Sequence, residues 1–183
     1  MIWLGTEKRL TRTTPKIQAV ERLIVDCNGN PDLPESVLQI GARYYNEGYR
    51  RRKEGLADEA GEYFTKAIGV WNRIIQELPS TVFTTRAYYL SGASYRYLGN
   101  YEKAIECYQE IAYRWPDYEY AWDAWFQVGY LFEKLEGSGV IPTDIAAPEI
   151  RYAYEKVIAD YPESKAAKAA RRRLKRWELT DSQ

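Results

Sequence analysis

The clearest pattern in the chain lies in residues 85–118, where two runs of apolar residues recur at the spacing of an amphipathic helix. The first run covers residues 86–98 and the second covers residues 101–114. Gly99 lies between the runs, and Pro116 follows the second run. Because glycine and proline at such places end helices, the pattern predicts a hairpin of two antiparallel helices.

Small and large side chains alternate within this hairpin. Gly92 and Ala104 allow two helices to approach closely, and rings such as Tyr88 and Tyr108 can fill the grooves beside them. Together with the final proline, this arrangement resembles the tetratricopeptide repeat, a unit of about 34 residues. The resemblance implies a fold of stacked helical hairpins that binds a protein or a peptide, and it does not name the partner.

A longer unit precedes the central hairpin. It covers residues 35–80 and takes Gly41 and Ala67 as its small positions. These two residues lie farther apart in the chain than the corresponding pair of the central hairpin. Helix-forming residues fill the extra length on both sides of Gly55, so we expect an elongated hairpin there.

A third unit follows, in residues 119–163, with Gly129 and Ile150 at its small positions. Its extra length falls in residues 136–148, whose glycines and prolines interrupt the helical pattern. We therefore expect a loop over residues 136–148. Ile150 is larger than the alanine that the family has at this place, which leaves the tightness of the third hairpin open.

The two ends of the chain show weaker patterns. Residues 1–13 have no clear period and are predicted to be a tail, while residues 14–30 predict one helix that resembles the second half of a repeat. Residues 164–179 predict a final helix with one apolar stripe and several basic faces, as a solenoid needs at its end. The predicted fold is all-α: a right-handed α-solenoid of about three tetratricopeptide-like hairpins, with an N-terminal half-repeat and a C-terminal capping helix.

Composition narrows the classes of function. The 183 residues include 26 Lys and Arg against 26 Asp and Glu, so no global field attracts nucleic acid or a membrane. The chain has no His, which removes the usual general base and the commonest zinc ligand. Cys27 and Cys107 are far apart, and no phosphate loop or nucleophile motif occurs. We predict a protein that is not an enzyme, with no catalytic residue, no metal site and no cofactor.

The sequence also bears on location. No apolar run approaches the length of a membrane span, so the chain as written is predicted to be soluble and cytoplasmic, or periplasmic if an N-terminal signal segment has been removed. The segments DLPES, RWPDYEYA and DYPESKAAKAARRRL resemble the bacterial envelope subgroup of tetratricopeptide proteins. That subgroup includes outer-membrane assembly lipoproteins and cell-division coordinators.

The resemblance further implies a concave surface lined by the first helix of each hairpin. We predict that this surface binds a peptide or a partner protein, because tyrosine offers a large contact area at a low entropic cost. The alternative, that several of these rings pack between neighbouring first helices, stays open. The predicted lining residues are Leu38, Tyr45, Arg86, Tyr89, Ala93, Arg96, Asp123, Phe126, Tyr130 and Glu133.

Two other functions remain as alternatives. The half-repeat at residues 14–27 could stack on a second copy, giving a homo-oligomeric structural component of a bacterial envelope complex. Basic clusters at residues 50–53 and 168–176 could contact nucleic-acid phosphates, although cations also favour helix C-termini and the net charge of zero argues against this function. Some family members clamp the C-terminal carboxylate of a chaperone, but apolar or aromatic residues such as Leu38 and Phe126 occupy those positions here. A chaperone tail is therefore not the expected ligand.

Overall fold

The computed structural model of the chain describes residues 33–78 and 80–180. Within these residues the chain forms seven α-helices and no β-strand. The all-α architecture of helical repeats that the sequence predicts is confirmed. The predicted tail and half-repeat, residues 1–13 and 14–30, lie outside the described residues.

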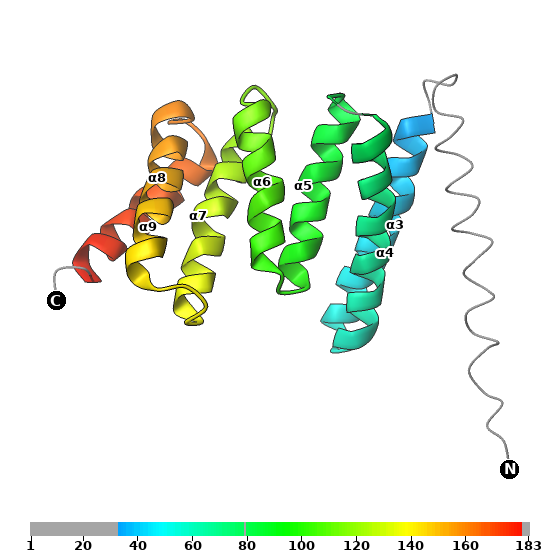
Figure 1. The fold of residues 1–183 in the computed structure, drawn as a ribbon, viewed down its shortest axis with the longest axis horizontal. Coiled ribbons are helices and arrows are strands. Elements are labelled where there is room, and N and C mark those ends of the chain that lie inside the picture. Colours follow the sequence, from blue (N-terminus) through cyan, green and yellow to red (C-terminus); the bar gives the residue numbers. More distant parts are fainter. Residues whose placement is uncertain (1–32, 79, 181–183) are drawn as a thin grey trace, which may run out of the picture. The chain divides into compact units, whose positions relative to one another are not determined.

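The described chain divides into two compact units, of which the first ends at Ala87 and the second begins at Tyr88. The first unit contains α3 (Leu33–Lys53), α4 (Ala57–Glu77) and the start of α5 (Val82–Tyr97) (Figure 1). The second unit contains the rest of α5, followed by α6 (Tyr101–Arg114), α7 (Ala121–Gly137), α8 (Thr143–Asp160) and α9 (Lys165–Thr180). One helix, α5, therefore contributes residues to both units.

In the first unit, α3 and α4 pack against each other along their length. They meet at a turn in which Gly55 has φ of 81°, a left-handed conformation that glycine adopts without steric cost. The side chains of Phe64 and Trp71 on α4 are 1% and 0% exposed and fill the space between the helices. Both helices thus continue through the stretch in which the sequence predicts an elongated hairpin.

The three second helices α4, α6 and α8 end in the same backbone geometry. Their C-cap residues are Leu78, Trp115 and Tyr161, with φ of −126°, −133° and −132° and ψ of 57°, 62° and 54°. In the sequence each of these residues precedes a proline. The ring of a proline disfavours helical geometry at the residue before it, so the proline determines where each helix ends.

Each hairpin brings a glycine of its first helix against a ring of its second helix. The pairs are Gly41 with Trp71, Gly92 with Tyr108, and Gly129 with Tyr154. A β-carbon at Gly92 would lie 3.0 Å from the Tyr108 ring, and one at Gly129 would lie 2.7 Å from the Tyr154 ring. The packed interior leaves no room for even one extra methyl group at these contacts.

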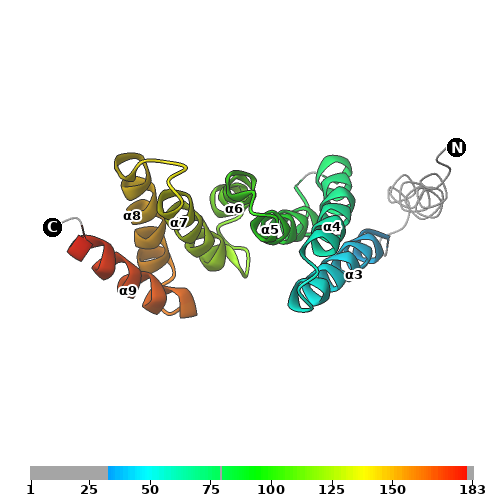
Figure 2. The same cartoon turned by 90° about the horizontal axis from the view of Figure 1, so that it is seen from below.

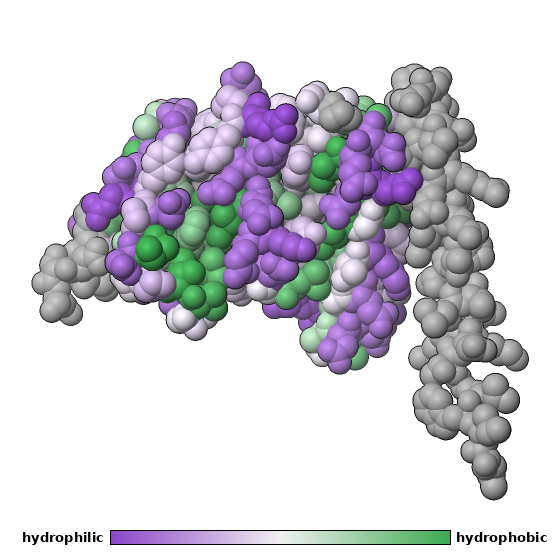
Figure 3. Space-filling model, viewed as in Figure 1, coloured by the Kyte–Doolittle hydropathy of each residue, from purple (hydrophilic) through white to green (hydrophobic). Residues whose placement is uncertain are grey.

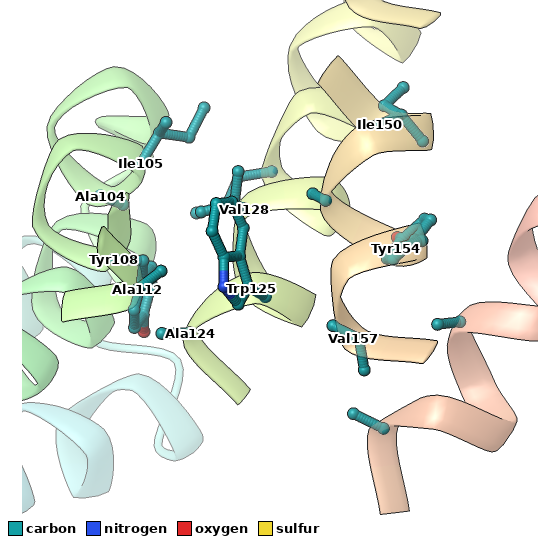
Figure 4. Close-up of a cluster of buried hydrophobic side chains, with 14 of the residues drawn as sticks. Ala104, Ile105, Tyr108, Ala112, Ala124, Trp125, Val128, Ile150, Tyr154 and Val157 are labelled. Atoms are coloured by element: carbon teal, nitrogen blue, oxygen red, sulfur yellow. The ribbon is translucent and has the colours of Figure 1, made fainter. Parts of the chain in front are cut away.

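The core of the second unit lies between α6, α7, α8 and α9. Figure 4 shows Trp125 of α7 between side chains of α6 and side chains of α8. Trp125 is 2% exposed, and Val128 and Val157 of the same cluster are 1% and 0% exposed. Ile150 is 1% exposed, so its larger side chain is accommodated in the core of the third hairpin.

The connection between α7 and α8 is shorter than the sequence predicts. α7 ends at Gly137 and α8 begins at Thr143, which corrects the predicted loop of residues 136–148 to residues 138–142. Pro148 lies inside α8, where it removes one backbone hydrogen bond near the start of the helix. The helix continues through it because Ala146 and Ile150, on either side, are 0% and 1% exposed and bury this turn.

The last described helix, α9, packs on α8 and α7. It begins after Ser164, whose Oγ accepts a hydrogen bond of 3.1 Å from the backbone N–H of Ala167. Ala167 and Ala170 are fully buried on its inner face. Figure 2 shows α9 lying beside α8. No helix in the described residues is both long enough and apolar enough to span a lipid bilayer.

Candidate functional site

Three of the predicted lining residues lie in the first unit. Leu38 is 2% exposed, so it belongs to the core and offers a partner almost no surface, which corrects its assignment to the lining. Tyr45 is half-buried, with its ring 5.6 Å from Phe64 and 6.2 Å from Trp71 between centroids. Arg86 donates a hydrogen bond of 2.8 Å from Nη1 to Oε2 of Glu35. The first unit therefore presents an ion pair and one half-buried ring.

In the second unit, a chain of polar contacts joins α5 to α7. The hydroxyl of Tyr89 donates to Oδ2 of Asp123 over 2.6 Å. The Nε2 amide of Gln127 donates weakly to the same carboxylate at 3.4 Å, and Nη1 of Arg96 donates to Oε1 of Gln127 at 3.5 Å. Ala93, between these contacts on α5, is only 8% exposed and so also adds little to any surface.

Tyr89 is part of a cluster of tyrosine rings. Its ring lies 5.4 Å from that of Tyr120, 5.8 Å from Tyr108 and 6.4 Å from Tyr118. Burial raises the pKa of Tyr89, and the neighbouring Asp123 carboxylate raises it further, so the hydroxyl remains a neutral donor. The ring of Tyr89 therefore packs against Tyr108 of α6 and against two tyrosines of the α6–α7 connection, while its place in a partner-binding surface stays a prediction. Tyr120 is 40% exposed, so the cluster of rings reaches the protein surface at this residue.

Farther along α7, Phe126 and Tyr130 form a partly exposed aromatic surface. The guanidinium of Arg173 on α9 lies 5.8 Å from the centroid of Phe126 and 5.1 Å from that of Tyr130. The same guanidinium forms an ion pair with Glu133, whose side chain is 15% exposed. Cation–π and ionic contacts together fix the position of Arg173 over the two rings.

Tyr154 of α8 lies beneath this surface. Its ring is fully buried and lies 5.5 Å from Phe126 between centroids. Burial raises the pKa of the Tyr154 hydroxyl, and the nearby Glu133 carboxylate adds to the shift. The hydroxyl stays protonated, and the ring supports Phe126 from the core side.

An open hollow lies beside the aromatic surface of α7. Its volume is about 280 Å³, and it is lined by Phe126, Ala169, Arg172, Arg173 and Arg176. The sequence predicts a capping role for α9 and gives its basic cluster, residues 168–176, as an alternative contact for nucleic-acid phosphates, but it does not predict this hollow. Arg172 and Arg176 are four residues apart, which places both on one face of a helix, and this spacing is the only signal in the sequence for a shared site.

The basic cluster at residues 50–53 is engaged in ion pairs within the hairpin. Arg50 lies 2.5 Å from Glu47 and 2.9 Å from Glu54, and Arg51 lies 2.9 Å from Glu47 and 3.1 Å from Glu59. Because carboxylates already neutralise these two arginines, little of their charge is left for a phosphate backbone.

Other exposed apolar groups lie away from the predicted lining. Tyr113 of α6 and Tyr152 of α8 are 58% and 44% exposed, and their rings meet Trp125 edge-on at 4.9 Å and 5.5 Å. Figure 3 shows apolar side chains gathered near the α7–α8 turn, where Val140 and Ile145 are 59% and 55% exposed. These groups are exposed positions outside the surface that Phe126 and Tyr130 form on α7.

Among the described residues, no group of three or more His, Cys, Asp or Glu side chains is placed so that it could hold a metal ion. The thiol of Cys107 is buried, and burial together with Glu106 and Glu110 raises its pKa to about 12. A thiol in this state is neither a nucleophile nor a metal ligand near neutral pH.

Comparison with known proteins agrees with the geometry of the central hairpin. Residues 85–118 match the family model described as "Tetratricopeptide repeat". The match covers the pair Gly92 and Tyr108 and the helix end before Pro116. Among curated proteins, none matches the chain.

Proposed function

We propose that the chain belongs to the tetratricopeptide class of protein–protein interaction scaffolds, whose repeat matches residues 85–118, and that it binds a peptide or partner protein on the α7 face of its second unit, around Phe126 and Tyr130. The observation that carries this proposal is the partly exposed pair Phe126 and Tyr130 with Arg173 held above both rings. The class is typically non-catalytic, and the proposed role is that of a scaffold without catalysis.

The composition of this surface supports a binding role. Aromatic side chains and arginine are enriched at protein interfaces and dominate their binding free energy. Tyr154 supports Phe126 from the core side, and Arg173 lies over the rings of both Phe126 and Tyr130. A partner would therefore meet rings that are already ordered, which lowers the entropic cost of association.

The test is a selection of binding peptides from a random phage-displayed library, followed by affinity measurements on purified protein. We expect the double variant Phe126→Ala and Tyr130→Ala to lower the affinity for the selected peptides by about tenfold or more. The matched control is Tyr152→Ala, which removes an exposed ring from α8 outside the proposed surface. Circular dichroism of each variant checks the helical fold.

Two outcomes contradict the proposal. One is a selection that returns no binding peptide. The other is a peptide whose affinity is unchanged by the double variant or is lost equally in Tyr152→Ala. The predicted self-association through residues 14–27 lies outside the described residues and stays a prediction.

A further inference from the structure

The hollow beside Phe126 carries an excess of positive charge. Three of its five lining residues are the arginines of α9. Arg173 is paired with Glu133. Arg172 has no carboxylate partner among the described residues, and the side chains of Arg172 and Arg176 are exposed. Arg172 therefore adds a positive charge at the rim of the hollow that no carboxylate of the described residues balances, and Phe126 is the one aromatic ring in its lining.

We propose that this hollow binds the carboxylate of an aspartate or glutamate side chain in a peptide partner, with Arg172 and Arg176 as the binding residues. The inference rests on the proposed function and names the chemistry of the peptide at that site. A guanidinium can donate two parallel hydrogen bonds to a carboxylate, and two guanidiniums on successive turns of one helix can hold it from both sides.

The arrangement also specifies what lies next to the acidic residue. Phe126 forms one wall of the hollow and continues into the surface that includes Tyr130. An apolar side chain next to the carboxylate can lie against these rings while the carboxylate contacts the arginines. We expect peptides in which an acidic residue has an apolar or aromatic neighbour.

A peptide fits this site better than a nucleic-acid strand does. Binding of single-stranded nucleic acid uses a long basic track with several rings on which successive bases stack. Here three arginines line one hollow of about 280 Å³ with one ring in its wall. The other basic stretch, around Arg50 and Arg51, is neutralised by its own carboxylates.

The experiment compares two charge-matched double variants in the full chain. Arg172→Gln with Arg176→Gln removes two positive charges from the hollow. Arg171→Gln with Lys175→Gln removes two positive charges from exposed positions of the same helix that do not line the hollow. The probes are peptides selected from the random library, the same peptides with Asp and Glu replaced by Asn and Gln, and an oligouridylate RNA.

We expect the selected peptides to be enriched in Asp and Glu. Their affinity should fall by about tenfold in Arg172→Gln with Arg176→Gln, and by a similar factor when the peptide's carboxylates become amides. The control variant should retain nearly full affinity at an ionic strength of about 0.15 M, where remote surface charge is largely screened.

The other outcomes overturn the inference. Peptides without acidic enrichment, or an equal loss in both variants, refute the carboxylate site, while a continued dependence on Phe126 and Tyr130 keeps the proposed function. If oligouridylate binds more tightly than the peptides and its binding depends on Arg172, the occupant of the hollow is nucleic acid and the inference is wrong. A selection that returns no peptide removes both the inference and the proposed function.

Discussion

The hydroxyl of Tyr89 donates a hydrogen bond of 2.6 Å to Oδ2 of Asp123, and this bond ties α5 to α7 in the second unit. Both helices are the first helices of successive hairpins, and Asp123 begins the row of α7 residues that leads to Phe126 and Tyr130. The bond thus orders the helix that carries the proposed binding surface.

Tyr89→Phe should destabilise the protein, because it keeps the ring contacts and leaves Asp123 without its short hydrogen bond. A hydrogen bond to a charged acceptor predicts a loss of about 1.5–3 kcal/mol in the free energy of unfolding. Urea denaturation measures the loss. Tyr120→Phe, in the same cluster of rings, is the control and should change the free energy of unfolding by less than about 0.5 kcal/mol. Equal effects of the two substitutions would argue that the bond to Asp123 is unimportant.

Gly129→Ala should destabilise the third hairpin, because the new β-carbon would lie 2.7 Å from the ring of Tyr154. Overpacking of this kind costs about 1–3 kcal/mol. Gly69→Ala is the matched control, since Gly69 is also within a helix but has no atom within 4 Å of the position that its β-carbon would take. That change should stabilise the protein by about 0.5–1 kcal/mol through helix propensity. Thermal denaturation measures the melting temperature of each variant. The prediction fails if both melting temperatures lie above that of the wild type, or if both lie below it.

The Glu47 carboxylate should make the first unit sensitive to acid. Hydrogen bonds from Arg50 and then Arg51 lower the pKa of Glu47 from 4.5 to about 2. A lowered pKa in the folded state adds stability above pH 4.5, and this stability is lost as the pH falls towards 2. Glu47→Gln should therefore flatten the loss of stability across this range, as measured by urea denaturation at a series of pH values.

Two controls accompany the acid experiment. High salt should reduce the effect, because Arg50 and Glu54 in this network are largely exposed. Glu155→Gln removes an exposed carboxylate of α8 that has no ion-pair partner among the described residues. It should leave the pH dependence of the free energy of unfolding unchanged. If the free energy of unfolding of Glu47→Gln depends on pH as steeply as that of the wild type, Glu47 is not the source of the acid sensitivity.

The thiol of Cys107 should react only when the protein opens. In a Cys27→Ser background, an aromatic disulfide reagent at about pH 8 needs a thiolate, and the raised pKa of about 12 keeps the native thiol protonated as well as buried. We expect slow modification in native buffer and rapid modification in concentrated urea. Rapid modification of the native protein would show that α6 opens far more readily than its packing indicates.

The parts of the fold that the sequence predicts are those set by short-range rules. The contact of Gly92 with Tyr108 follows from alternating small and large residues, and the turn at Gly55 follows from a glycine between two helix-forming stretches. The helix ends before Pro116 and Pro162 follow from the restriction that proline places on the preceding residue.

The parts that differ depend on tertiary packing. Pro148 indicates a loop by local rules, yet burial of Ala146 and Ile150 holds it in a helix. Leu38 occupies a surface position by its place in the repeat, but packing buries it. The hollow needs α7 and α9 side by side, and no pattern within either segment reports that contact.

The position of Arg173 has one more consequence, for the last described helix. Its ion pair with Glu133 and its stacking on Phe126 and Tyr130 are part of what docks α9 on α7. A ligand that binds only the docked helix shifts the docking equilibrium towards the bound arrangement by mass action. The affinity of the partner and the fraying of α9 are then thermodynamically linked, so that the partner completes the fold of the helix that receives it.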